Sequence, residues 1–124
     1  GVEAASLAWM PLGWSPAWFS EIDPFACAVL NTHFPLVENL GDMTKIEGNK
    51  YEGKIDILVG GTPCQGFSVA GKRKGLLDER SALFLSYCRL LETMRPRWFV
   101  WENVPGVLST NEGNDFKLFL QKKK

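Results

Sequence analysis

Residues 60–68 read Gly-Gly-Thr-Pro-Cys-Gln-Gly-Phe-Ser and directly follow the mostly apolar run 55–59. That run predicts a buried strand, which the two glycines end. Because proline crowds the residue before it, Thr62-Pro63 favours an extended or turn conformation. Cys64 is therefore expected at the carboxyl end of a strand, where open α/β sheets place their ligands. The residues alone leave two interpretations open, a nucleophile or a packed thiol, because most cysteines are buried and inert.

Helices and strands are predicted to alternate on both sides of this stretch. Gly13 closes the first helix, Asp23 and Pro24 cap and open the second, and Pro35 stops it. The hydrophobic spacing predicts helices over 2–12, 24–34, 83–94 and 116–120, strands over 17–21, 37–40, 55–59 and 98–102, and a polar surface loop over 47–54. Such alternation predicts an α/β fold with a parallel sheet.

The composition limits the chain to a single domain. It has 124 residues, of which 45% are hydrophobic, and its 14 basic residues balance its 14 acidic ones. No global field therefore indicates a nucleic-acid partner, and any basic surface must be local. Basic clusters stand at 72–74 and 122–124, although either is also typical of a solvated loop or a frayed tail. Three cysteines without metal-like spacing (Cys27, Cys64 and Cys88) predict neither a disulfide framework nor a metal site.

The ends of the sequence predict a fragment of an intracellular protein. No signal peptide opens the chain, and no apolar run approaches the roughly 20 residues that span a bilayer, so no membrane partner is expected. The chain begins at Gly1, without a methionine and within a helical pattern.

The wording around Cys64 resembles a known catalytic motif. Residues 60–68, followed by Ala-Gly-Lys-Arg-Lys-Gly at 70–75 and Asp-Glu-Arg at 78–80, are similar to the motif of DNA (cytosine-5)-methyltransferases. The resemblance implies a Rossmann-like fold dependent on S-adenosylmethionine, and double-stranded DNA with a flipped cytosine as partner. It also implies a cytoplasmic, bacterial or phage-encoded enzyme of restriction-modification or phage DNA protection. An RNA (tRNA) cytosine-5 methyltransferase and a non-catalytic remnant of the family remain alternatives.

Two further segments resemble the cofactor-binding parts of this family. In Ser20-Glu21-Ile22-Asp23, the resemblance implies that Glu21 binds the cofactor ribose and that Ile22 lies against its adenine, whereas Asp23 is assigned to helix capping. In Gly41-Asp42-Met43, it implies that Asp42 accepts from the adenine amino group and that Met43 flanks the ring. From the residues alone, a Glu such as Glu21 is more often simply an exposed strand-end residue, and the alternative for Asp42 is a turn residue. The resemblance adds three more cofactor positions: Gly1, Pro63 and Leu83, the last with core packing as its alternative.

Glu102-Asn103-Val104 matches the family motif that supplies a general acid. Cytosine accepts a thiolate at carbon 6 only when negative charge on the ring is relieved, and a carboxyl group at ring nitrogen 3 can share a proton there. Glu102 must then keep a proton near neutral pH, which burial among neighbouring aromatic residues would favour; these are Trp98, Phe99 and Trp101. Its alternative role is to cap the next loop. By resemblance, Cys64 is the nucleophile that attacks carbon 6.

The resemblance also implies residues that contact DNA. Because the target carbon cannot be reached inside a duplex, the cytosine must be flipped out. Gln65 and Ser68 are expected at the flipped nucleotide or its phosphates, and three basic residues at the DNA backbone: Lys72, Arg73 and Lys74. Arg80 is expected as a pair partner or phosphate ligand, and His33 is assigned no role.

The resemblance runs from Gly1 to about Leu120, so residues 1–121 are interpreted as a partial catalytic domain and 122–124 as a tail. Compared with the family, the first strand, expected between the strands that end at Glu21 and Gly60, and the target recognition region are absent. The isolated chain is therefore expected to be inactive, and to self-associate through exposed sheet edges.

Overall fold

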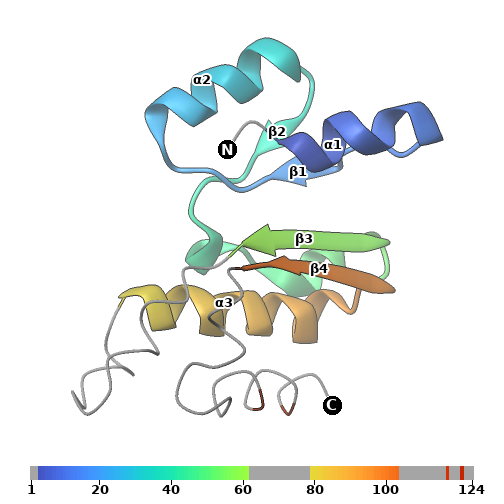
Figure 1. The fold of residues 1–124 in the computed structure, drawn as a ribbon. Coiled ribbons are helices and arrows are strands. Elements are labelled where there is room, and N and C mark those ends of the chain that lie inside the picture. Colours follow the sequence, from blue (N-terminus) through green and yellow to red (C-terminus); the bar gives the residue numbers. More distant parts are fainter. Residues whose placement is uncertain (1–2, 62–78, 104–116, 118–120, 122–124) are drawn as a thin grey trace. The chain divides into compact units, whose positions relative to one another are not determined.

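The computed structural model describes residues 3–61, 79–103, 117 and 121. The chain divides into two compact units, residues 1–46 and residues 47–124. Each unit contains two parallel strands with one helix between them in the sequence (Figure 1). The predicted mixture of helices and parallel strands is thus confirmed within each unit.

The first unit opens with a helix that ends where the sequence predicts. Helix α1 (Ala4–Trp9) continues into the 3₁₀-helix η1 (Met10–Leu12). Gly13 then follows with φ of 83°, the left-handed region that glycine adopts without strain. Its N–H donates to the carbonyl of Met10 at 3.0 Å, which closes the last turn.

Strands β1 (Trp18–Phe19) and β2 (Glu38–Asn39) pair in parallel, with Phe19 opposite Asn39. Helix α2 (Pro24–His33) lies between them in the sequence, and the carboxylate of Asp23 accepts from the N–H of Ala26 at 2.9 Å. This bond confirms Asp23 as the predicted N-cap. A small apolar core joins the strand to the helix: Phe19, Leu30, Phe34 and Val37.

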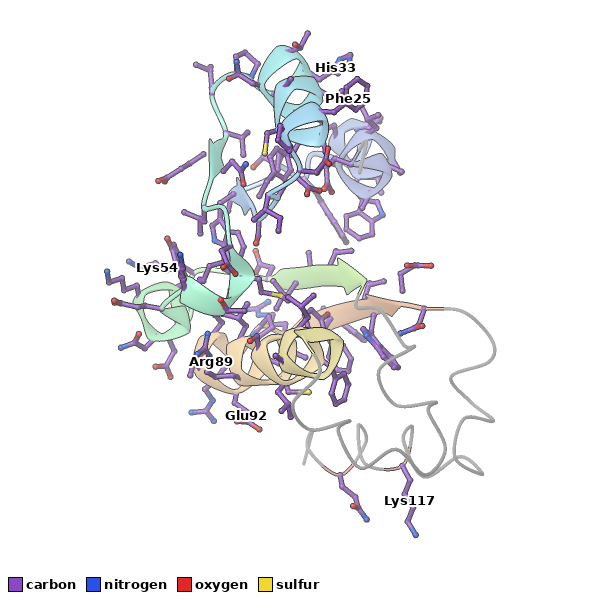
Figure 2. The ribbon with its side chains drawn as sticks, turned by 90° about the vertical axis from the view of Figure 1, so that its left-hand side faces the viewer. Phe25, His33, Lys54, Arg89, Glu92 and Lys117 are labelled. Atoms are coloured by element: carbon purple, nitrogen blue, oxygen red, sulfur yellow. The ribbon has the colours of Figure 1, made fainter. Side chains whose placement is uncertain are left out.

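The second unit is a parallel pair covered on one face by a long helix (Figure 1). Strand β3 (Ile57–Gly61) pairs with β4 (Trp98–Glu102) in a register that runs from Ile57 opposite Trp98 to Gly61 opposite Glu102. Helix α3 (Glu79–Met94) buries the predicted apolar stripe: Phe84, Tyr87, Leu90, Leu91 and Met94. Arg89 and Glu92 lie on the side of α3 that faces away from the strands (Figure 2).

Two sequence predictions for this unit are corrected. The predicted surface loop at 47–54 contains the 3₁₀-helix η3 (Gly48–Tyr51), and Gly48 is buried. A Cβ at Gly48 would collide with Thr93 of α3, so the missing side chain is what lets this segment pack there. Strand β3 also includes the two glycines that were expected to end it. At Gly60 the ring of Tyr87 occupies the space that a side chain would need, so a glycine is the residue that fits there.

The four described strands form two separate two-stranded sheets, β1–β2 and β3–β4. A continuous Rossmann-like sheet remains a prediction. The predicted last helix, 116–120, lies outside the described residues apart from Lys117 (labelled in Figure 2). In the part of the chain that the structure describes, no helix has the length and apolar character needed to cross a membrane.

Candidate cofactor and catalytic sites

The segments that follow β1 and β2 are tied together by one side chain. Asn39, the last residue of β2, accepts through Oδ1 from the N–H of Glu21 at 2.9 Å and from the N–H of Gly41 at 3.1 Å. The hydroxyl of Ser20 also donates to the carbonyl of Gly41 at 2.7 Å. These bonds continue the pairing beyond the two-residue strands. They hold Glu21 and the Gly41-Asp42 segment side by side.

The Glu21 carboxylate folds back over the turn that leads into α2. Its Oε1 accepts from the N–H of Ile22 at 2.9 Å and from the N–H of Asp23 at 3.0 Å. Next to it, the side chain of Ile22 is 72% exposed. An acceptor and an open apolar surface therefore stand together at the end of β1.

Asp42 caps the 3₁₀-helix η2 (Met43–Lys45) that follows β2. Its Oδ1 accepts from the hydroxyl of Thr44 at 2.7 Å and from the N–H of Thr44 at 2.9 Å. These bonds, the hydroxyl first, lower the pKa of Asp42 below its ordinary value, so the group is an ionised acceptor at neutral pH. Asp42 therefore caps this turn through Oδ1, Oδ2 takes part in neither bond, and the cofactor role of Asp42 stays a prediction. Met43 beside it is half-buried.

The ends of β3 and β4 carry a second arrangement. Gly61 lies opposite Glu102, and a Cβ on Gly61 would stand 2.8 Å from Oε2 of Glu102. Trp101 packs against Phe84 of α3, with their ring centroids 6.0 Å apart. Because successive side chains of a strand point to opposite faces, Glu102 lies on the face away from α3.

The expected burial of Glu102 among aromatic residues is wrong, because its side chain is exposed. The strand alternation explains the difference: Trp101 points to α3, whereas Trp98, which shares the face of Glu102, is itself 73% exposed. The side chains of Trp101 and Glu102 thus point to opposite faces of the strand although the two residues are adjacent in sequence.

Groups of metal-binding character do not gather within the described residues: no three His, Cys, Asp or Glu side chains come close enough to hold an ion. Of the three cysteines, Cys27 and Cys88 lie within the described residues, and both are thiols. The Cys27 thiol donates to the carbonyl of Glu21 at 3.3 Å.

The family model for the C-5 cytosine-specific DNA methylase matches the chain over residues 1–124. The chain belongs to this family.

Relatives of this methylase chain come from phages and bacteria. It is 53% identical to a protein of Escherichia phage P1 named DNA N-6-adenine-methyltransferase, over 97% of the chain and 17% of that protein. It is 41% identical to the orphan methyltransferase M.SPRI of Bacillus phage SPR, over 98% of the chain and 28% of the relative. It is 34% identical to the type II methyltransferase M.Eco47II of Escherichia coli, over 91% of the chain and 27% of the relative. The chain thus spans less than a third of each of these relatives.

The remaining predicted site residues of the methylase chain are placed unequally. Leu83 is half-buried in α3, and the structure does not decide between its cofactor and packing roles. The backbone of Arg80 belongs to α3, and its side chain lies outside the described part. The other predicted positions all lie outside the described residues: Gly1, Pro63, Cys64, Gln65, Ser68, Lys72, Arg73 and Lys74. The cysteine and DNA-binding predictions therefore remain predictions.

Sequence reasoning missed Asn39 and the spatial pairing of Gly61 with Glu102. Asn39 stands two residues before Gly41, and an Asn in such a place is ordinary turn chemistry. Only the strand register shows that its amide faces Glu21. His33, given no role from sequence, is exposed at the end of α2, as is Phe25 near its start (Figure 2).

Proposed function

We propose that this chain carries the cofactor-binding and catalytic strand ends of an enzyme that methylates carbon 5 of cytosine in DNA, with S-adenosylmethionine as the methyl donor. One observation carries the cofactor part of the proposal. Glu21 and Asp42 follow adjacent parallel strands and are held together by the Asn39 amide and the Ser20 hydroxyl. Ligands of α/β folds bind at such carboxyl ends.

The residues present fit the adenosine part of that donor. Ribose hydroxyls and the adenine amino group donate hydrogen bonds, and Glu21 and Asp42 are both acceptors. An adenine ring also needs apolar neighbours, which exposed Ile22 and half-buried Met43 supply. By resemblance to the family, Leu83 and Pro63 are also proposed as cofactor contacts, and Gly1 is proposed to approach the methionine part. When bound, S-adenosylmethionine supplies a methyl group on a positively charged sulfur.

Cys64 and Glu102 act on the cytosine ring. The Cys64 thiolate forms a bond to carbon 6, and the electron pair of the ring double bond makes carbon 5 nucleophilic. Glu102 shares a proton with ring nitrogen 3, which relieves the negative charge. A cytosine whose edge meets Glu102 would exclude water from the exposed carboxyl group and so strengthen the hydrogen bond to ring nitrogen 3. After methylation, a base removes the proton of carbon 5, the double bond re-forms, and the Cys64 thiolate leaves.

The target base must leave the duplex before Cys64 can reach it. We assign the segment after Cys64 to the DNA side of the site. Gln65 and Ser68 would hold the flipped nucleotide, whereas the basic residues would neutralise phosphates: Lys72, Arg73, Lys74 and Arg80. The names of the phage and type II relatives support a role in restriction-modification or phage DNA protection.

A covalent trap tests the cysteine chemistry. The full-length protein that carries this sequence is incubated with S-adenosylmethionine and duplex DNA containing 5-fluorocytosine, whose carbon 5 has no proton to lose. We expect a protein–DNA complex that survives denaturation and is absent for Cys64→Ser. Cys88→Ser serves as the matched control and should still form the complex, because Cys88 is buried in the core on α3. A Cys64→Ser protein that still forms it would overturn the assignment.

The name of the phage P1 relative raises adenine N6 as a second target. That relative is 53% identical to the chain, but the match covers only 17% of its length. Methylation of an exocyclic amine needs no ring adduct, so it would survive Cys64→Ser. Digestion of DNA methylated by the full-length protein separates the two, since the proposal predicts 5-methylcytosine and not N6-methyladenine. A covalent complex on fluorinated RNA alone would favour the RNA enzyme, and silence on both polymers would favour a remnant.

A further inference from the structure

The amide of Asn39 is fully engaged although its residue is exposed. Its Oδ1 accepts from the N–H groups of Glu21 and Gly41, at 2.9 and 3.1 Å. Its Nδ2 donates to the carbonyl of Glu21 at 3.0 Å and to the sulfur of Cys27 at 3.2 Å. A primary amide offers two donors and two acceptor lone pairs, so all four are used. This pattern fixes the orientation of the amide, because turning it over would set N–H against N–H.

Three of these four bonds join the backbone that carries the two candidate acceptors. Both polar backbone groups of Glu21 bond to Asn39, and the second N–H comes from Gly41, one residue before Asp42. Gly41 has φ of 75°, a turn that directs the chain toward Asp42. The bonds lie at the point where the ladder of β1 and β2 ends, since Phe19 opposite Asn39 is the last pair. Together with the bond from Ser20 to the carbonyl of Gly41, the amide therefore ties two strand ends that the short sheet alone does not join.

No other side chain of this length offers two donors and two acceptor lone pairs. Aspartate has the same shape but no donor, so it would direct a carboxylate oxygen at the carbonyl of Glu21 and add charge between two other carboxylates. Serine is too short to span both segments, and an aliphatic residue would leave four groups without this partner. Because Asn39 is exposed, its replacement creates no cavity in the core.

We infer that Asn39 is a positioning residue for the adenosine part of the cofactor: without touching it, the amide sets the spacing of Glu21 and Asp42. The inference rests on the proposed function, because it requires those two residues to hold the cofactor. Its signature is a loss of cofactor affinity that operates through Glu21, with the chemical step at saturation nearly unchanged.

The test measures binding of S-adenosylhomocysteine to the full-length protein by calorimetry, and KM and kcat for methyl transfer to DNA. For Asn39→Asp and Asn39→Ala we expect the Kd and the KM for S-adenosylmethionine to rise about tenfold, while kcat changes less than about twofold. Asn31→Asp, the same charge change at an exposed position of α2, is the control and should bind as the wild type does. Each variant is assayed well below its own thermal midpoint, so that only folded protein is compared.

A double-mutant cycle with Glu21→Gln separates positioning from general loosening. If Asn39 acts through Glu21, the combined rise in Kd is smaller than the product of the single effects. A full product, or an equal loss in Asn31→Asp, overturns the inference. The inference is also overturned if both Asn39 variants bind S-adenosylhomocysteine normally while Glu21→Gln or Asp42→Asn binds it more weakly. In that case the proposed cofactor site still stands. Unchanged binding in Glu21→Gln and Asp42→Asn refutes the proposed site and, with it, the role of Asn39.

Discussion

Gly61 and Glu102 lie opposite each other at the ends of β3 and β4, and the glycine leaves the space that the carboxyl group occupies. A Cβ at Gly61 would stand 2.8 Å from Oε2 of Glu102. The preceding residue, Gly60, serves the opposite face, where a Cβ would stand 2.6 Å from Cε2 of Tyr87. Two adjacent glycines thus accommodate an exposed acid and a buried ring. Their substitutions should therefore have different consequences.

Gly61→Ala should impair catalysis more than folding. The added methyl group displaces the Glu102 carboxyl group from its place over β3. We expect kcat for methyl transfer to fall about tenfold or more, because even a small displacement of a catalytic group slows the reaction. Stability should change little, because the exposed Glu102 side chain can turn away. In a Glu102→Ala background the same substitution should have no further effect. An equal further loss would show that Gly61 acts elsewhere.

Gly60→Ala should lower stability instead. The ring of Tyr87 is only 1% exposed and cannot move without disturbing α3, so we expect a loss of about 1–3 kcal/mol in the free energy of unfolding, as for other overpacked cores. Urea denaturation monitored by circular dichroism measures it. Tyr87→Ala removes the ring, and in that background the penalty of Gly60→Ala should largely disappear. An unchanged urea midpoint for Gly60→Ala alone would contradict this packing.

Tyr87→Phe tests the buried hydroxyl between β3 and β4. The hydroxyl donates to the carbonyl of Val100 at 3.0 Å, and the carbonyl of Leu58 lies 3.5 Å from it. Removing the hydroxyl should lower the free energy of unfolding by about 1 kcal/mol. Burial, followed by the neighbouring Cys88, raises the pKa of Tyr87 above its ordinary value of 10.0.

The raised pKa gives Tyr87 a signature in alkali. Above about pH 10 the unfolded chain loses the phenol proton that the folded chain keeps, so the wild type becomes less stable as pH rises. Tyr87→Phe lacks this group and should show a shallower decline in unfolding free energy. Parallel curves for the two proteins would mean that the Tyr87 hydroxyl is not protected in the fold.

Asp23→Ala should separate the capping residue from the cofactor residues beside it. Losing the bond to the N–H of Ala26 should lower stability by about 1 kcal/mol, and Asp23→Asn, which still caps, should restore most of it. Affinity for S-adenosylhomocysteine should stay within about twofold of the wild type when the protein is kept folded. An affinity loss as large as that of Glu21→Gln would place Asp23 in the cofactor site as well.

Local sequence signals were sufficient for most of the elements. Asp23-Pro24 and Pro35 bracket α2, and the apolar stripe of α3 matches its buried face, because capping and helical periodicity depend on residues only a few positions apart. The strand Trp98–Glu102 was predicted at its observed bounds for the same reason. The DNA methylase family was also predicted from motif wording, and the match over residues 1–124 confirms it.

What the sequence did not predict depends on register and packing. The exposure of Glu102 depends on which face of β4 packs against α3. The need for a glycine at position 48 depends on Thr93 of α3, which lies 45 positions later in the sequence. Asn39 gains its four bonds only once β2 pairs with β1. Such relationships join residues that are distant in sequence, and no local pattern carries them. Half-buried Leu83 stays ambiguous because a cofactor wall and a core have the same apolar composition.

The alternation of Trp101 and Glu102 has a consequence for how this strand can evolve. Trp101 packs against the helix and Glu102 lies on the open face, so neighbouring residues of the strand have different roles on opposite faces. Removing or adding one residue within β4 would exchange the two faces, sending the acid toward Phe84 and the indole into water. Substitution can therefore tune this strand, whereas insertions and deletions can be accommodated only beyond its ends.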